Sequence, residues 1–359
     1  MKRLFYVMAL SATVLLTGCS NDETTEISES NAIAFNASTS NVTRGTATTT
    51  NSISAFKTYA FLGTDAYMDG VTVSKGTDSK WTAENTYFWP KNTLNFYSVS
   101  PSTLSLTTTG VGSGTTTPTI SFTVPAAAES QTDLLYAVNI APTSGQQVNV
   151  NFRHALSQIV FKAKNTNSAL KVIINGVKIA NLNNAGTYTY PNATTSSSSS
   201  DKGSWGSTLT GTETFVAGIT ETTLTGSSTA TATNITADNG ALFLLPQTQT
   251  AWVPADNQNP TGTYFLVNCK IYSVSGSNET LLWPATETFA EVAIPVGITW
   301  AEGNKYTYTF IFGEGGGYEP GTDDPVLVPI TFDVTVDEFV DMSETEIDAD
   351  TNSTSSTTE

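Results

Sequence analysis

Few residues in this chain have the types and the spacing that catalysis or metal binding requires. His154 is the one histidine among 359 residues, and its apolar neighbours favour a packed side chain over a catalytic base. Residues 348–359 match the spacing of a calcium loop, but Ser353 stands where that loop needs glycine. The glycine-rich segment 313–321 has no lysine to hold a phosphate. We therefore predict that the protein is not an enzyme and uses no metal and no cofactor.

The composition favours strands and argues against a polyanionic partner. Acidic residues outnumber basic ones by 32 to 15, and the formal net charge is -17. Because nucleic-acid binding needs clustered Lys and Arg, we predict no nucleic-acid partner. Glycine, serine, threonine and aromatic residues take the place of strong helix formers. This composition predicts an all-β fold.

The elements that this composition must build are short strands. From residue 33 onwards, apolar runs alternate with clusters of Gly, Asn, Ser and Pro, and no long segment has the period of an amphipathic helix. The segment 141–147 is the best candidate linker. We therefore predict an N-terminal β-sandwich domain over 45–144 and a C-terminal one over 145–340. The acidic tail 341–359 has almost no apolar content and is predicted to be disordered.

The N-terminus has the layout of a secretory signal over residues 1–18. Two basic residues precede a mainly apolar run, 4–16, that is too short to span a bilayer stably. The sequence Leu-Thr-Gly-Cys follows, which resembles the lipobox of bacterial lipoproteins and makes Cys19 the expected lipidation site. An ordinary signal peptide with an incidental cysteine is the alternative. Residues 20–23, Ser-Asn-Asp-Glu, look like the acidic export tag of surface lipoproteins, although a solvated acidic tether would have the same sequence character.

Strand-like alternation also marks both ends of the region between the signal and the tail. Ile33 and Phe35 alternate with small residues, just before a polar stretch that contains Arg44. Cys269 alternates with apolar residues and is expected to pack in a core. The last strong strand lies within 326–340 and turns one apolar row to one side: Ile330, Phe332, Val334 and Val336.

Several short motifs follow the lipobox in a fixed order. They are IAFNA at 33–37, TRGT at 43–46, YFWP at 87–90, LNFYS at 94–98, TDLLYA at 132–137, FRHALSQ at 152–158, LLPQ at 244–247 and FDVTV at 332–336. In this order the motifs resemble the fimbrillin-like (Mfa-like, type V pilin) lipoproteins of Bacteroidales. Each motif is weak alone, but the resemblance extends from Cys19 to about Val340.

The resemblance implies two tandem transthyretin-like Greek-key β-sandwich domains in a structural and adhesive subunit of a fimbria, at its stalk or tip. It implies export through the periplasm to the outer membrane as a lipoprotein. An Arg-specific surface protease would then cut between Arg44 and Gly45, so that residues 19–44 form an acidic tether, a first strand and a propeptide. For Arg44 the alternative is an ordinary solvated loop residue.

Assembly in the resembled family is by donor-strand exchange between fimbrial subunits, which are copies of one chain or different chains. The strand around Ile33 and Phe35 would be displaced, and a strand of a neighbouring subunit would fill the groove that it leaves. If this chain donates, the donor must come from 326–340, which could equally be a fixed strand of the second domain. The alternative function is that of a monomeric surface lipoprotein that binds glycans.

Overall fold

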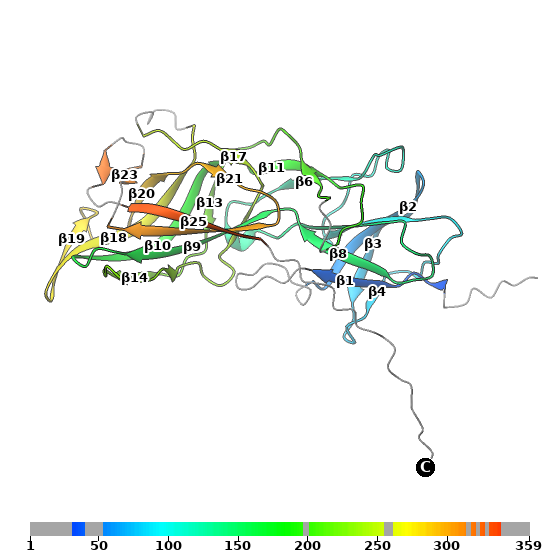
Figure 1. The fold of residues 1–359 in the computed structure, drawn as a ribbon, viewed down its shortest axis with the longest axis horizontal. Helices are drawn as coiled ribbons and strands as arrows, with labels where there is room; N and C mark the ends of the chain where they lie inside the picture. Colours follow the sequence, from blue (N-terminus) through cyan, green and yellow to red (C-terminus); the bar gives the residue numbers. More distant parts are fainter. Residues whose placement is uncertain are drawn as a thin grey trace, which may run out of the picture.

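The computed structural model describes residues 31–39, 53–196, 201–254, 261–313, 317–320, 324–326 and 330–338. The regular secondary structure of these residues is almost wholly β-strand, and a short 3-10 turn, η2 (Ala128–Ser130), is the exception that the strand order contains. The predicted all-β class is therefore confirmed. The molecule is elongated, with the strands of the N-terminal half at one end and those of the C-terminal half at the other (Figure 1).

The strands of the N-terminal half close into a barrel in the order β1-β4-β3-β2-β5-β7-β8. Val148, Val150 and Phe152 of β8 are among the residues that turn inward, because successive side chains of a strand point to opposite faces. The bounds are β1 (Phe35–Thr39), β2 (Ala55–Leu62), β3 (Asp65–Lys75), β4 (Trp81–Ala83), β5 (Asn95–Ser100), β7 (Leu135–Ile140) and β8 (Val148–His154).

Two features of this barrel were not expected from the sequence. β1 pairs with β4 on one edge and with β8 on the other, so the sheet closes on itself instead of remaining two open sheets. β8 also pairs with β7, so the sheet continues past the expected division at residue 144 and ends at His154. The candidate linker at 141–147 thus connects two neighbouring strands of the barrel.

The C-terminal half is a sandwich of two sheets. The larger sheet has the order β13-β10-β18-β20-β23-β24, with β14 beside β10 and β19 beside β18. The smaller sheet has the order β15-β9-β22-β25, with β16 beside β9. Their inner faces meet through aromatic rings, and the ring of Phe265 lies 5.9 Å from that of Phe161 and 5.3 Å from that of Phe310. Facing sheets that bury aromatic residues in this way account for the stability of this half.

The strands of the larger sheet are β10 (Leu170–Leu182), β13 (Glu213–Ala217), β14 (Thr222–Thr225), β18 (Tyr264–Ser275), β19 (Asn278–Trp283), β20 (Ala290–Pro295), β23 (Gly317–Tyr318) and β24 (Pro325–Val326). Those of the smaller sheet are β9 (Ser157–Asn165), β15 (Thr233–Asn234), β16 (Leu242–Leu244), β22 (Asn304–Phe312) and β25 (Ile330–Glu338). A further pair consists of β17 (Thr248–Gln249) and β21 (Ile298–Thr299).

A small sheet and a row of tyrosines join the two halves. The sheet contains β6 (Thr119–Thr123), β11 (Ala185–Thr189) and β12 (Ser204–Trp205), in the order β12-β11-β6. Tyr136 of the barrel lies 4.9 Å from Tyr188 and 5.7 Å from Tyr190, measured between ring centroids. These rings belong to a core cluster that continues into the C-terminal sandwich, so the halves are held together by buried apolar area.

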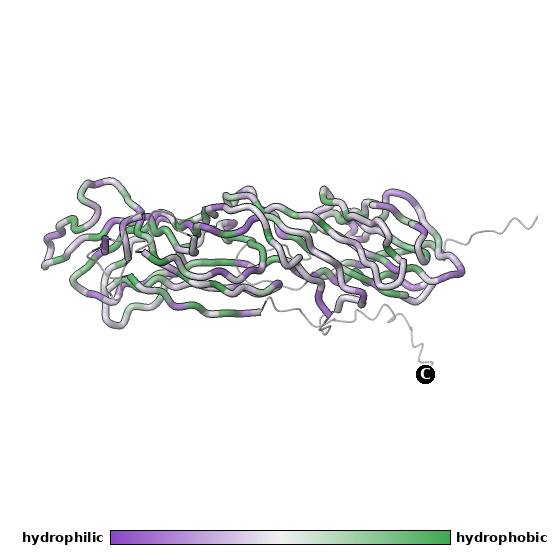
Figure 2. Tube along the Cα trace, turned by 90° about the horizontal axis from the view of Figure 1, so that it is seen from above, coloured by the Kyte–Doolittle hydropathy of each residue, from purple (hydrophilic) through white to green (hydrophobic). Residues whose placement is uncertain are grey.

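Apolar and polar segments alternate along the strands at both ends of the molecule (Figure 2). Within the described ranges, no helix combines the length and the apolar character that a membrane crossing requires.

Candidate functional site: the closing strand and the edge strand

The first candidate site is β1, the strand that closes the barrel. Its apolar side chains are almost completely buried: Ile33 just before it is 8% exposed, Phe35 3% and Ala37 4%. The ring of Phe35 makes edge contacts with Phe56 at 6.2 Å and with Phe96 at 6.0 Å. The alternation read from the sequence therefore matches a strand that inserts one row of side chains into the barrel core.

Both edges of β1 are paired. It lies parallel to β8, in a register that runs from Phe35 opposite Val148 to Thr39 opposite Phe152, and antiparallel to β4 through Phe35 and Trp81. The Gln147 side chain adds a hydrogen bond from Nε2 to the carbonyl oxygen of Phe35 at 3.0 Å. Because β1 alone connects β4 with β8 in the strand order, its removal would open the barrel and leave two strand edges unpaired.

The polar face of β1 also has specific partners on β8. Asn36 Nδ2 donates to Asn149 Oδ1 at 3.4 Å, and Ser38 Oγ donates to Asn151 Oδ1 at 2.6 Å. These partners are 113 residues apart in the chain. The two asparagines thus bind the polar side chains of β1 by hydrogen bonds, while the barrel core packs against its apolar side chains.

The second candidate site is β25, the strand proposed from the sequence as a donor. It pairs antiparallel with β22 from Ile330 opposite Phe312 to Glu338 opposite Asn304. In the described part of the chain it ends the order of the smaller sheet, so its other edge has no strand partner there.

The apolar row of β25 is buried only in part. Ile330 is 1% exposed, and Phe332 packs its ring 5.5 Å from that of Phe265. Farther along, Val334 is 42% exposed and Val336 51% exposed, although both lie on the same side of the strand as Phe332. An edge strand with two half-exposed valines is held less firmly than β1.

Of the other residues that the sequence singled out, one lies in the core and three lie outside the described residues. Cys19, Arg44 and Gly45 lie outside the described residues. Cys269 is fully buried, and burial raises the pKa of its thiol far above the ordinary value, so the interpretation as a core residue is confirmed. Among the described residues, no group of three His, Cys, Asp or Glu side chains is placed to hold a metal ion.

His154 lies at the end of β8 and is buried, as its apolar neighbours predicted. Its Nδ1 is 2.6 Å from Oδ2 of Asp133, and both side chains are almost completely shielded from solvent. Asp133 lies two residues before the start of β7, the neighbour of β8. The pair therefore fastens two adjacent barrel strands, and its burial gives a substrate no approach to the imidazole.

A buried carboxylate lies at the junction of the halves, and the sequence pattern gives no sign of it. Glu302 lies in the turn before β22, and its Oε1 accepts a hydrogen bond from the Tyr136 hydroxyl at 3.3 Å. Burial raises the pKa of the Glu302 carboxyl to about 7, against smaller opposing effects of Lys202, Arg153 and the tyrosine hydroxyls. Burial likewise raises the pKa of Tyr136 to about 12. No motif reveals this cluster, because its members come from distant parts of the chain.

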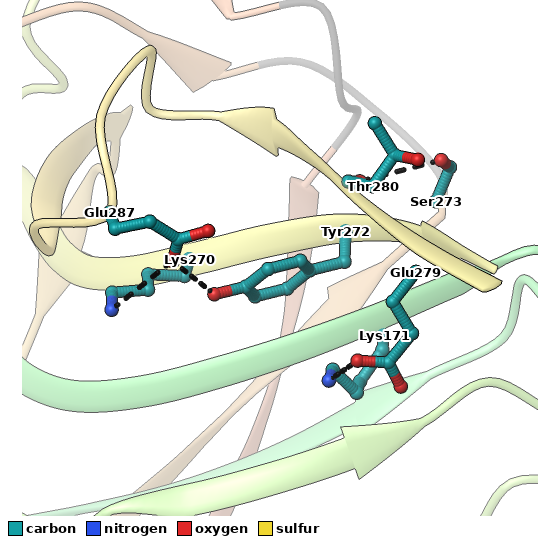
Figure 3. A network of polar contacts seen from close by, with 7 residues as sticks. All are labelled: Lys171, Lys270, Tyr272, Ser273, Glu279, Thr280 and Glu287. Carbon is teal, nitrogen blue, oxygen red and sulfur yellow. Dashed lines mark hydrogen bonds and ion pairs between the residues drawn. The ribbon is translucent and has the colours of Figure 1, made fainter.

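Exposed glutamates on the larger sheet pair with partly buried lysines. Glu287 on the surface accepts a hydrogen bond from the Tyr272 hydroxyl at 2.9 Å and lies 3.8 Å from Lys270 Nζ (Figure 3). Lys171 forms an ion pair with Glu279 and places its Nζ 4.6 Å from the Tyr272 ring centroid. These contacts join β10, β18 and β19 on a solvated face, and each contributes little by itself.

The molecule is thus an elongated all-β protein with a buried closing strand in its N-terminal half and a partly exposed edge strand in its C-terminal half. The chain belongs to the fimbrillin-like family, whose model matches residues 38–337. This is a family of fimbrial and cell-adhesion proteins, which are structural, generally non-enzymatic and found at the cell surface. The resemblance seen in the ordered motifs is thereby confirmed.

Solved structures provide the fold comparison. A fimbrial protein from Bacteroides vulgatus is 16% identical, with 86% of this chain and 99% of that chain covered and a TM-score of 0.58. A fimbrilin from Porphyromonas gingivalis is 12% identical, with 87% of this chain and 98% of that chain covered and a TM-score of 0.41. No curated protein matches the chain.

Proposed function

We propose that the protein is a fimbrial subunit that polymerises by donor-strand exchange after proteolysis. The observation that carries this proposal is the position of β1, which alone connects β4 with β8 and buries Ile33, Phe35 and Ala37. Removing such a strand leaves an apolar groove between two unpaired edges. A strand from another subunit restores both the hydrogen bonds and the buried area. The division into two tandem transthyretin-like domains belongs to the same proposal.

Arg44 is the proposed cleavage site, and Gly45 becomes the new N-terminus. The segment that contains Arg44 follows β1 directly and connects it with β2, so a cut there removes the covalent link between β1 and the rest of the barrel. An uncut β1 stays close to its groove and outcompetes any strand that arrives from solution. Cleavage by an Arg-specific surface protease removes this advantage.

β25 is the proposed donor. β25 has a strand partner on one edge only among the described residues, and Val334 and Val336 are exposed, so it is the easier of the two strands to release. Release exposes Ile330 and Phe332, which then find equivalent burial in the groove of the next subunit. Exchange is slow because the groove must open first, and the same barrier makes the finished polymer durable.

Cys19 is the proposed lipid anchor of the precursor at the outer membrane, and cleavage after Arg44 frees the subunit from it. Cys19→Ala should leave the precursor unlipidated, so that it moves from the detergent phase to the aqueous phase on phase separation. Unchanged partitioning in the native type of host would remove the anchor from the proposal.

The proposed cleavage is tested by Arg44→Ala, with polymer yield measured by size-exclusion chromatography after treatment with an Arg-specific protease. The variant should stay a folded monomer, whereas the parent should polymerise. Arg153→Lys is the matched control, because Arg153 is the one other arginine beyond the signal and lies within β8. It should polymerise like the parent. Equal yields from Arg44→Ala and the parent would overturn the proposal.

A further inference from the structure

We infer that β25 of a second copy of this chain replaces β1 in one fixed register, with Ile330 in the site of Ile33 and Phe332 in the site of Phe35. This inference rests on the proposed function and adds the identity of the partner and the alignment of the strand. It follows from the side chains of the two strands and of β8, which match on both faces.

The apolar faces match in type and order. β1 and the residues before it present Ile33, Phe35 and Ala37 to the barrel core, and β25 presents Ile330, Phe332 and Val334 at the same spacing of two. In this register the Phe332 ring enters the site between Phe56 and Phe96 that holds Phe35. Val334 moves from a position where it is 42% exposed to one where Ala37 is 4% exposed, and so gains burial.

The polar faces match in the same register. Asp333 takes the place of Asn36 and can accept a hydrogen bond from the side-chain amide of Asn149. Thr335 takes the place of Ser38 and presents a hydroxyl to Asn151, as Ser38 does in the present structure. The two asparagines of β8 therefore serve the donor as well as they serve β1.

Other registers lose one or both matches. A slip by one residue turns Thr331 and Asp333 into the apolar core. A slip by two residues in one direction puts Phe332 in the small site of Ala37. The same slip in the other direction puts Val334 in the site of Phe35 and leaves a cavity of several carbon atoms.

Disulfide cross-linking between introduced cysteines can determine the register directly. In the inferred register the residue at 333 is the Cα neighbour of Asn149, as Asn36 is now, and the strand spacing of about 5 Å permits a disulfide. Asn151 lies two residues farther along β8, about 8 Å away, which is too far. Within one subunit Asp333 pairs with Thr309 of β22, so a disulfide to β8 reports contact between subunits.

The experiment compares Asp333→Cys/Asn149→Cys with Asp333→Cys/Asn151→Cys, both in a Cys269→Ser background. Each protein is purified alone, cleaved with the Arg-specific protease, allowed to polymerise, oxidised and run on a non-reducing denaturing gel. The Asn149 pair should give a ladder of covalent oligomers, and the Asn151 pair should remain monomeric on the gel. The two single-cysteine variants, each expected to give at most dimers, control for random oxidation.

Each alternative outcome has a distinct meaning. A ladder from the Asn151 pair alone would overturn the register and leave strand exchange standing. Polymers that cross-link with neither pair would show that β25 is not the donor in this alignment. If the parent chain is cleaved at Arg44 yet forms no polymer alone, a second copy is not the partner. If the cleaved chain also forms no polymer when other fimbrial subunits are added, the proposed function is overturned.

Discussion

β1 and β25 carry the same kind of alternating apolar row, but the protein holds them in opposite ways. β1 is paired along both edges, and its inward side chains are less than a tenth exposed. β25 is paired along one edge, and two of its four apolar side chains are about half exposed. Local sequence is therefore not what makes one strand firm and the other loose. The number of neighbouring strands decides it.

This difference assigns complementary roles to the two strands. A strand bound on both sides is costly to lose, so its loss needs a specific trigger, and cleavage of the connecting segment provides one. A strand bound on one side can exchange at a lower cost. Each subunit holds β25 weakly, whereas the barrel holds a strand in the position of β1 strongly. The free energy of the assembly therefore falls when β25 moves into the barrel of a neighbour.

The largest expected effect comes from Phe35→Ala in the uncleaved chain. The substitution removes a ring buried between Phe56 and Phe96 and should lower the free energy of unfolding of the barrel by about 3–5 kcal/mol. Urea denaturation followed by tryptophan fluorescence measures the loss. A loss under about 1 kcal/mol would show that β1 is not firmly held, and the comparison with β25 would fail.

Phe332→Ala in the same assay should cost less, about 1–2 kcal/mol, because Phe332 is only partly buried at the edge of its sheet. Its effect on assembly should be the larger one, since polymer yield after cleavage should fall sharply. A variant that polymerises like the parent would show that Phe332 does not anchor the donor.

The pH dependence of stability should reveal the junction between the two regions. The pKa of Glu302 is raised to about 7 in the folded protein from 4.5, so the unfolded chain ionises at lower pH than the folded one. Stability from this group is present below pH 4.5 and is lost as pH rises to about 7. Glu302→Gln removes this dependence. The free energy of unfolding of the variant, relative to that of the parent, should therefore rise between pH 5 and pH 8, on the order of 1–3 kcal/mol.

Glu129→Gln is the control, because Glu129 is an exposed glutamate on the 3-10 turn η2. It should change stability little and equally at both pH values. A Glu302→Gln variant whose advantage over the parent does not grow between pH 5 and pH 8 would contradict the buried state of this carboxylate.

The sequence predicted features that depend on local alternation and missed those that depend on distant pairing. The row around Ile33 and Phe35 and the row along β25 both appeared in the spacing of apolar residues. The parallel pairing of β1 with β8 joins residues 113 positions apart, and no local pattern encodes it. For this reason Asn149 and Asn151 gave no signal, and residue 144 looked like a domain boundary although it precedes a barrel strand.

Donor-strand exchange requires that β1 leave the barrel when subunits join. Mass spectrometry of the purified polymer, denatured after protease treatment and assembly, tests it most directly. The fragment ending at Arg44, which carries Ile33 and Phe35, should remain with cleaved monomers and be absent from the polymer. A polymer that retains one such fragment per subunit would contradict strand exchange at this groove.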